Sequence, residues 1–134
     1  MAANYRCDRV VRFADTDAAG VVYFAQLLSI CHEAYEDAIA DLGFDVRFFF
    51  SDRGTLILPI VHAEIDYRRP VHCGDRLTID LQATALSSDR FQIDYQITCG
   101  EQAVAQAQTV HRCLTSQTRE RSPLPDRLQT WLQS

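Results

Sequence analysis

The segment FAQLLSICHEAYEDAIADL, residues 24–42, decides the fold of this 134-residue chain. Its apolar side chains recur every three or four residues, the spacing of one helix face. They are Phe24, Leu27, Leu28, Cys31, Ala34, Tyr35, Ala38, Ile39 and Leu42. Gly43 follows, a residue that commonly ends a helix. So wide an apolar stripe predicts a long helix that lies deep against a sheet.

One extended segment precedes this helix and four follow it. The predicted strands are residues 5–13, 55–68, 77–85, 91–97 and a last strand around 103–107. Apolar and polar residues alternate along 77–85 and 91–97, which is typical of half-buried antiparallel strands. One strand, a long helix and four strands together indicate an α+β fold, in which a five-stranded antiparallel sheet wraps around one long central helix.

Smaller features refine this picture. Pro59 cannot donate a backbone hydrogen bond, so it predicts an edge strand or a bulge. Ala103, Ala105 and Ala107 are expected on one face of the last strand, where their small side chains let the helix lie close. The tail contains Pro125, after which we predict a short helix.

Length and composition indicate one domain over residues 1–134. Apolar residues make up 47% of the chain and charged residues 23%, an ordinary globular composition. No run approaches the ~18 consecutive apolar residues of a membrane span, and the N-terminus lacks a secretory signal, so we expect a cytoplasmic protein without a membrane span. Five cysteines without a C-x-x-C spacing favour reduced, structural thiols.

The charge of the chain indicates which kinds of binding partner to expect. The net charge is −5, and all thirteen basic residues are arginines. An acidic chain without a basic run argues against nucleic acid as a partner, because phosphate neutralisation dominates that binding. Arginine binds phosphate through two parallel hydrogen bonds, so a few clustered arginines could still hold a nucleotide-like ligand.

Two aspartates precede the helix, Asp15 and Asp17. They have a structural interpretation, in which acids cap the helix or form a turn. A metal site is another interpretation, but no further acidic or histidine cluster has ligand spacing, so we expect no metal. In the third interpretation a carboxylate lies beside free N–H groups of the helix start, where a carbonyl could be polarised while the carboxylate attacks it or activates water.

The motif DTDAAGVVYF, residues 15–24, followed by this helix and by VHAEIDYRRPVHCGDRL, resembles the hotdog-fold 4-hydroxybenzoyl-CoA thioesterase family. The resemblance covers nearly the whole chain. It implies that Asp17 is the catalytic carboxylate and that the backbone N–H of Phe24 binds the oxyanion. It also implies an acyl-CoA substrate, no bound cofactor and a homotetramer built from two dimers.

Substrate-binding residues also follow from the resemblance. It places the strand that carries His62 beside the acyl pocket, and it puts Arg90 where the family contacts CoA phosphates. Arg68, Arg69, Arg76 and Arg112 are alternatives for the phosphates. Structural or surface roles stay open for each of these residues.

The residue at position 24 indicates which kind of acyl group the substrate carries. Thioesterases associated with the Tol-Pal system resemble this core but have His where this chain has Phe24, and a phenyl ring suits an aromatic acyl group. The chain is most similar to cyanobacterial members that hydrolyse 1,4-dihydroxy-2-naphthoyl-CoA in phylloquinone biosynthesis. A broad-range acyl-CoA thioesterase and a non-catalytic acyl-CoA sensor are the alternatives.

Overall fold

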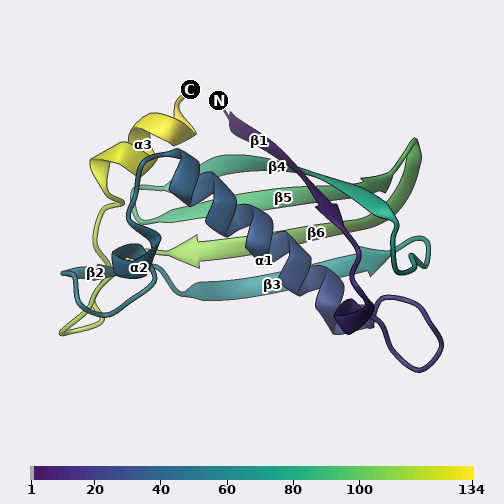
Figure 1. The fold of residues 1–134 in the computed structure, drawn as a ribbon. Helices are drawn as coiled ribbons and strands as arrows, with labels where there is room; N and C mark the ends of the chain where they lie inside the picture. Colours follow the sequence, from purple (N-terminus) through teal and green to yellow (C-terminus); the bar gives the residue numbers. More distant parts are fainter. Residues whose placement is uncertain (1) are drawn as a thin grey trace.

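The computed structural model describes residues 2–134, in which a five-stranded antiparallel sheet curves around helix α1 (Figure 1). The strands lie in the order β1-β4-β5-β6-β3, and β2 pairs with β7 in a separate two-stranded ribbon. In chain order the elements are β1 (Ala2–Val10), the 3₁₀ turn η1 (Phe13–Asp15), α1 (Phe24–Asp41), α2 (Val46–Phe49), β2 (Leu56–Ile57), β3 (Ile60–Tyr67), β4 (Arg76–Ser87), β5 (Arg90–Cys99), β6 (Gln102–Arg112), β7 (Leu114–Thr115) and α3 (Asp126–Leu132).

Helix α1 confirms the prediction made from its apolar stripe. It begins at Phe24, ends at Asp41, and is followed by Gly43 with a φ of 91°, a conformation that glycine adopts without strain. Its buried residues are Leu27, Ile30, Cys31, Ala34, Tyr35, Ala38 and Ile39. Phe24 departs from the stripe, because its side chain is 60% exposed at the first position of the helix.

The predicted strand over residues 55–68 is divided in two. The chain passes through Leu58 and Pro59 between β2 and β3, and the pairing of β3 with β6 shifts register between Ile60 and His62. Strand β3, which follows Pro59 directly, is an edge strand of the sheet, so the prediction of an edge or a bulge at Pro59 is confirmed. Seven of its eight residues are exposed.

The expectation that three alanines share the inner face of the last strand is wrong for Ala103. Ala105 and Ala107 are buried, but Ala103 is exposed. The register of β5 with β6 shifts beside Ile97, which pairs with Ala105 while the next residue pairs with Ala103. Val104 is the extra residue of this bulge and is itself buried. The first strand ends at Val10 rather than at residue 13, because the 3₁₀ turn already begins at Phe13.

The core between α1 and the sheet contains a short polar chain. His111 is fully buried, and its Nε2 lies 2.8 Å from the hydroxyl of Thr109, which lies 3.0 Å from that of Tyr95. The imidazole stacks on the ring of Phe91 at a centroid distance of 4.6 Å. Burial lowers the pKa of His111 to about 3, so this histidine is neutral in the folded protein near neutral pH.

The C-terminal segment closes one end of the core. Helix α3 follows Pro125 as predicted and buries Leu128 and Leu132. Within residues 2–134, no helix is both long enough and apolar enough to cross a bilayer.

Candidate active site

The loop between β1 and α1 is folded back on itself and fixed by backbone hydrogen bonds. The N–H of Asp17 donates to the carbonyl of Val21 at 2.9 Å, and the N–H of Gly20 donates to the carbonyl of Asp17 at 3.0 Å. Gly20 has a φ of 82°, which this turn requires. Val22 then donates to the carbonyl of Val71 at 2.9 Å, so the loop is also held by the turn that follows β3.

Asp15 anchors this loop from inside. It is 4% exposed, and its carboxylate accepts hydrogen bonds from the guanidinium of Arg9, from the N–H of Arg12 at 2.8 Å and from the amide of Gln26 at 3.0 Å. The pairing with Arg9 lowers the pKa of Asp15 below its usual range. Arg9 also binds Glu33 of α1 at 3.0 Å, so one cluster joins β1, the loop and the helix.

Asp17 lies outside this cluster. Its side chain is exposed, and one carboxylate oxygen accepts the N–H of Ala19 at 2.8 Å. That bond holds the side chain in the turn, and no other hydrogen bond within the described residues occupies the carboxylate. Asp17 is therefore the aspartate that solvent and a substrate can reach, whereas Asp15 orients the loop.

The start of α1 supplies free hydrogen-bond donors. Tyr23 occupies the N-cap position in an extended conformation and offers no side-chain acceptor. The N–H groups of Phe24 and Ala25 meet no acceptor from residues 2–134, whereas that of Gln26 donates to the Tyr23 carbonyl at 2.8 Å. Free N–H groups at a helix start attract negative charge, as an oxyanion requires. Since Asp17 pairs with Val21, the carboxylate lies on the loop that leads directly into these donors.

Aromatic side chains surround the helix start. The ring of Phe24 lies 4.8 Å from that of Tyr23 and 6.4 Å from that of Tyr67, measured between centroids. All three side chains are exposed by 45% or more, as is Phe13 at 83%. These rings give the free N–H groups an apolar surround that suits a flat acyl group.

Sequence reasoning missed Tyr67. Its hydroxyl donates to the Phe24 carbonyl at 2.6 Å, which fixes the first turn of α1 against the end of β3. These residues stand 43 positions apart, so no local spacing could have revealed the contact. The roles of Arg9 and Gln26 beside Asp15 were missed for the same reason.

The structure does not bring His62 and Arg90 to this end of the sheet. Tyr67 is the last residue of β3 and lies against the start of α1, whereas His62 lies near the other end of β3, 54% exposed and 3.8 Å from Glu64. Arg90 begins β5 beside Arg112. A strand of 10 residues spans roughly 30 Å, so Arg90 lies about that far from Cys99 at the other end of β5.

The other arginines that the sequence offered for the CoA phosphates lie at both ends of the sheet. Arg68 and Arg69 directly follow β3, and Arg76 begins β4, so these three lie at the end of the sheet where β3 meets the start of α1. Arg112 lies at the far end with Arg90. Across residues 2–134 no three His, Cys, Asp or Glu side chains are arranged as metal ligands.

Comparison with known proteins identifies the family. Residues 11–132 match the thioesterase-like superfamily. The 1,4-dihydroxy-2-naphthoyl-CoA hydrolase of Synechococcus elongatus is 72% identical over 98% of this chain and 96% of its own length. The hydrolase of the same name from Thermosynechococcus vestitus is 54% identical over 94% of this chain and 86% of its own.

The crystal structure of a 1,4-dihydroxy-2-naphthoyl-CoA thioesterase from Synechocystis superposes with a TM-score of 0.91. It is 43% identical, and the alignment covers 100% of this chain and 97% of that one. The sequence match, these relatives and the sheet wrapped around α1 agree. The chain therefore belongs to the thioesterase-like superfamily and has the hotdog fold of its thioesterases.

Proposed function

We propose that this protein hydrolyses 1,4-dihydroxy-2-naphthoyl-CoA to the free acid and CoA, as part of phylloquinone biosynthesis. The observation that carries the proposal is the 72% identity, over 98% of the chain, to a hydrolase named for that substrate. The exposed Asp17, on the loop that leads into the uncapped start of α1, supports the proposal. The enzyme is an acyl-CoA thioesterase.

In the proposed mechanism the thioester carbonyl oxygen accepts the N–H of Phe24, so that negative charge develops where the helix dipole stabilises it. Asp17 then acts in one of two ways. It attacks the carbonyl carbon and forms an acyl-aspartate that water hydrolyses, or it removes a proton from the water that attacks. In both routes the C–S bond breaks, the sulfur takes a proton, and water supplies the new carboxyl oxygen. The proposal needs no metal and no cofactor, because CoA is part of the substrate.

The proposal includes a homotetramer built from two dimers, located in the cytoplasm. Support for a dimer comes from β3, which leaves its outer edge unpaired and exposes Ile60, Val61 and Tyr67. An exposed edge strand of this kind is a template for pairing with another strand. A second protomer across this edge would bring His62 and Arg90 toward the site. All five cysteines are free thiols, as expected in a reducing compartment.

A panel of acyl-CoA thioesters tests the function. The purified protein is offered 1,4-dihydroxy-2-naphthoyl-CoA, benzoyl-CoA, straight-chain acyl-CoAs and acetyl-CoA, and the released thiol is measured. The proposal predicts the highest kcat/KM for the naphthoyl thioester. A preference for straight-chain thioesters would indicate a broad-range thioesterase instead. Tight binding without turnover would indicate a sensor.

A further inference from the structure

The loop that carries Asp17 is closed at its base by Asp15. The backbone carbonyl of Asp15 accepts the N–H of Tyr23 at 2.9 Å, and its carboxylate accepts the side-chain amide of Gln26 at 3.0 Å. Tyr23 is the N-cap of α1, and Gln26 is the third residue of the helix. One buried aspartate therefore holds the helix start twice, once through the main chain and once through a side chain.

Gln26 also holds the peptide group that presents the candidate oxyanion donor. The N–H of Phe24 and the carbonyl of Tyr23 belong to one peptide group, which is planar, so the direction of the carbonyl fixes the direction of the N–H. That carbonyl accepts the backbone N–H of Gln26 at 2.8 Å. Gln26 therefore connects the Asp15 carboxylate, through its side chain, to the peptide group of the Phe24 N–H, through its main chain.

The two free N–H groups at the helix start are held by different residues. The Ala25 N–H shares its peptide group with the Phe24 carbonyl, which accepts the hydroxyl of Tyr67 at 2.6 Å. Tyr67 thus orients one donor from β3, and Gln26 orients the other from within the helix. A change at Gln26 should therefore disturb the Phe24 N–H and leave the Ala25 N–H in place.

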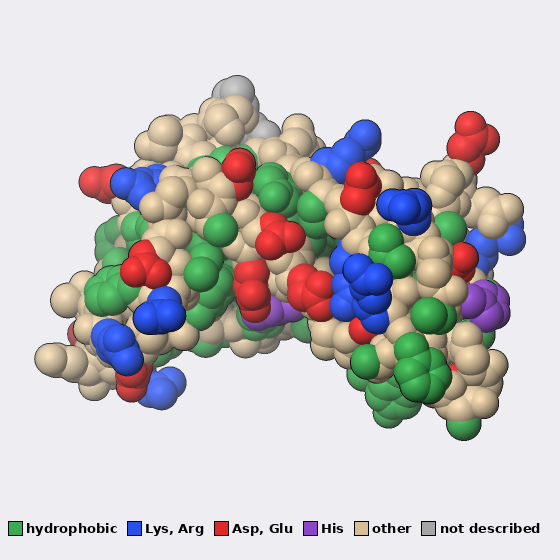
Figure 2. Space-filling view, viewed as in Figure 1, with side chains coloured by type: hydrophobic (Ala, Val, Ile, Leu, Met, Phe, Trp, Pro, Cys, Tyr) green, Lys and Arg blue, Asp and Glu red, His purple; other side chains and the backbone are tan. Residues whose placement is uncertain are grey.

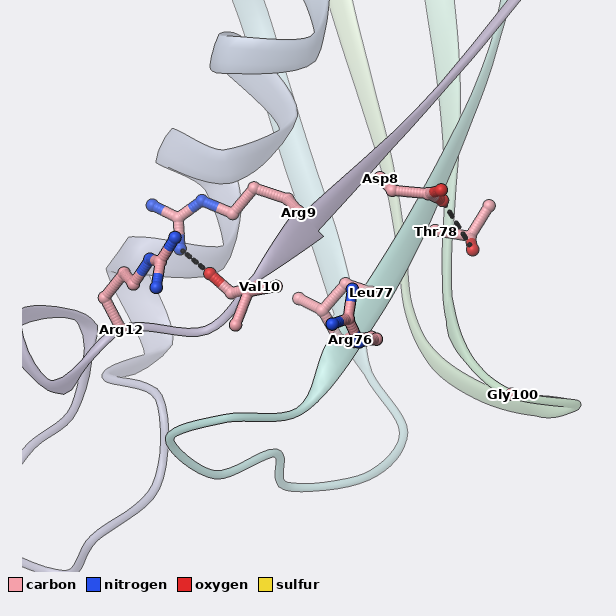
Figure 3. A pocket seen from close by; sticks show the side chains of 8 residues that line it. All are labelled: Asp8, Arg9, Val10, Arg12, Arg76, Leu77, Thr78 and Gly100. Carbon is pink, nitrogen blue, oxygen red and sulfur yellow. Dashed lines mark hydrogen bonds between the residues drawn. The ribbon is translucent and has the colours of Figure 1, made fainter.

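The aspartate that holds Gln26 is itself fixed. Its carboxylate also accepts the guanidinium of Arg9, and the N–H of Arg12 at 2.8 Å. Arg9 in turn binds Glu33 of α1 at 3.0 Å, and Figure 3 shows its side chain extending from the end of β1 toward the helix. A carboxylate with these partners changes position little, so the side chain of Gln26 is held in place.

A neutral side chain at position 26 suits a site where negative charge develops. Acidic residues are common in the first turn of a helix, where the dipole stabilises them, but the first turn of α1 has none. The acidic residues of α1 come later in the helix, and acidic side chains gather on its outward side (Figure 2). A glutamate at position 26 would put a second negative charge beside Asp15 and in the same helical turn as the Phe24 N–H. A carboxamide donates to the Asp15 carboxylate without adding charge.

We propose that Gln26 is a positioning residue of the active site, whose side chain binds Asp15 and whose backbone N–H thereby aims the peptide group that binds the oxyanion. Gln26 acts through the Phe24 N–H and does not contact the thioester. The inference rests on the proposed function for the reaction. It extends that function by assigning how the oxyanion donor is held in place.

Gln26→Met tests the proposal, since methionine has a similar length but no amide to donate. The rate of thiol release in a single turnover should fall about tenfold, because a misaimed donor loses part of the roughly 100-fold or more that one oxyanion donor supplies. KM should stay within about twofold of the wild-type value. The loss of rate should be the same for 1,4-dihydroxy-2-naphthoyl-CoA and acetyl-CoA, since both develop the same oxyanion. An unchanged rate, or an increase in KM without a loss of rate, would overturn the proposal.

The matched control is Gln129→Met. Gln129 lies near the start of α3, outside the candidate site, and its side-chain amide donates to the Leu124 carbonyl of the preceding loop at 2.6 Å. Both variants should lower Tm by roughly 3–8 °C, because each loses one hydrogen bond. Only Gln26→Met should lose rate, and equal losses in the two variants would show that Gln26 acts on stability alone.

The variant Gln26→Glu adds a test through pH. When protonated, the new carboxyl group can donate to Asp15 as the amide does, and when ionised it repels Asp15. The charged groups of the cluster are Asp15, Arg9 and Glu33, and pairing with Arg9 lowers the pKa of Asp15, so Asp15 stays ionised in mild acid. The single-turnover rate of Gln26→Glu relative to wild type should therefore rise as the pH falls from about 8 to about 5. The relative rate of Gln26→Met should stay constant over that range, and a constant relative rate for Gln26→Glu as well would contradict the proposal.

Amide hydrogen exchange separates this inference from the proposed function. The protection factor of the backbone N–H at position 26 should fall at least ~10-fold in Gln26→Met, because its bond to the Tyr23 carbonyl is loosened. Gln129→Met should leave that protection factor unchanged. Equal protection in wild type and Gln26→Met would show that the side chain does not hold the helix start. If protection is lost but the wild type hydrolyses none of the thioesters, the proposed function fails while the anchoring by Gln26 stands.

Discussion

Asp15 and Asp17 stand two residues apart, and replacing each with asparagine should produce opposite results. Asp17→Asn keeps an oxygen that can accept the N–H of Ala19, and the side chain is exposed, so the free energy of unfolding should change by no more than about 0.5 kcal/mol. Turnover should fall at least ~100-fold, because the amide can neither attack nor remove a proton. That loss corresponds to about 2.7 kcal/mol of transition-state free energy.

Asp15→Asn removes a buried charge that three donors hold. Breaking a buried ion pair costs roughly 3–5 kcal/mol, but Arg9 is 20% exposed and keeps Glu33, so we expect about 2–3 kcal/mol. For a chain of this length that lowers Tm by about 7–12 °C. Activity should fall much less than in Asp17→Asn, because the loop is loosened while the reacting carboxylate remains.

The pH dependence gives this pair of variants an internal check. Pairing lowers the pKa of Asp15 in the folded state, so its contribution to stability is present above the unfolded pKa near 4 and is lost as the pH falls through the folded pKa. The difference in Tm between wild type and Asp15→Asn should therefore narrow in acid. Thermal unfolding by circular dichroism and thiol release from 1,4-dihydroxy-2-naphthoyl-CoA measure the two effects. Near-normal turnover by folded Asp17→Asn would refute the assignment of the reacting carboxylate.

Three further changes probe the helix start and the core. Phe24→Ala should reduce kcat/KM for the naphthoyl thioester by roughly 10- to 200-fold, because the apolar contact with the acyl group is lost. The loss for acetyl-CoA should be much smaller, since the backbone N–H remains. Equal losses on both substrates would show that the Phe24 side chain only packs the helix. Tyr67→Phe removes only the hydroxyl that holds the Phe24 carbonyl, so kcat should fall several-fold for long and short thioesters alike while KM holds; an unchanged kcat would remove Tyr67 from the site. Burial lowers the pKa of His111 to about 3, so below pH 6.5 the unfolded state binds a proton that the folded state does not. The free energy of unfolding should therefore fall by about 1.4 kcal/mol per pH unit from pH 6.5 toward pH 3. His111→Gln should flatten that slope in denaturant titrations, and an identical slope would show that other groups cause the acid sensitivity.

Much of the fold could be predicted because local patterns determine it. The apolar stripe of α1 and the alternation along β4 and β5 follow from burial on one face, and that periodicity is visible in any single sequence. The errors fell where pairing between distant segments decides the outcome. A bulge in β6 turned Ala103 outward, and nothing near Ala103 indicates that its neighbour Val104 would be the extra residue.

The candidate site shows the same division. Asp17 and Phe24 could be named because the motif is contiguous and the resemblance carries it. Tyr67 reaches the helix start only through the pairing of β3 with the sheet, which the local sequence around Tyr67 does not reveal. The placement of Arg90 also depends on strand pairing, because the register of β5 with β6 puts Arg90 beside Arg112, at the end of β6 that lies away from Tyr67.

The missing cap of α1 has a consequence for the end of the reaction. The Phe24 and Ala25 N–H groups attract the oxygen of the thioester only as its charge develops, but the acid that is released carries a full negative charge at the same position. The departing carboxylate is then itself a helix cap, and the Asp17 carboxylate on the adjoining loop opposes it by repulsion. The free acid should therefore be a competitive inhibitor, it should raise Tm when added, and its dissociation, rather than cleavage of the C–S bond, should limit turnover at high substrate concentration.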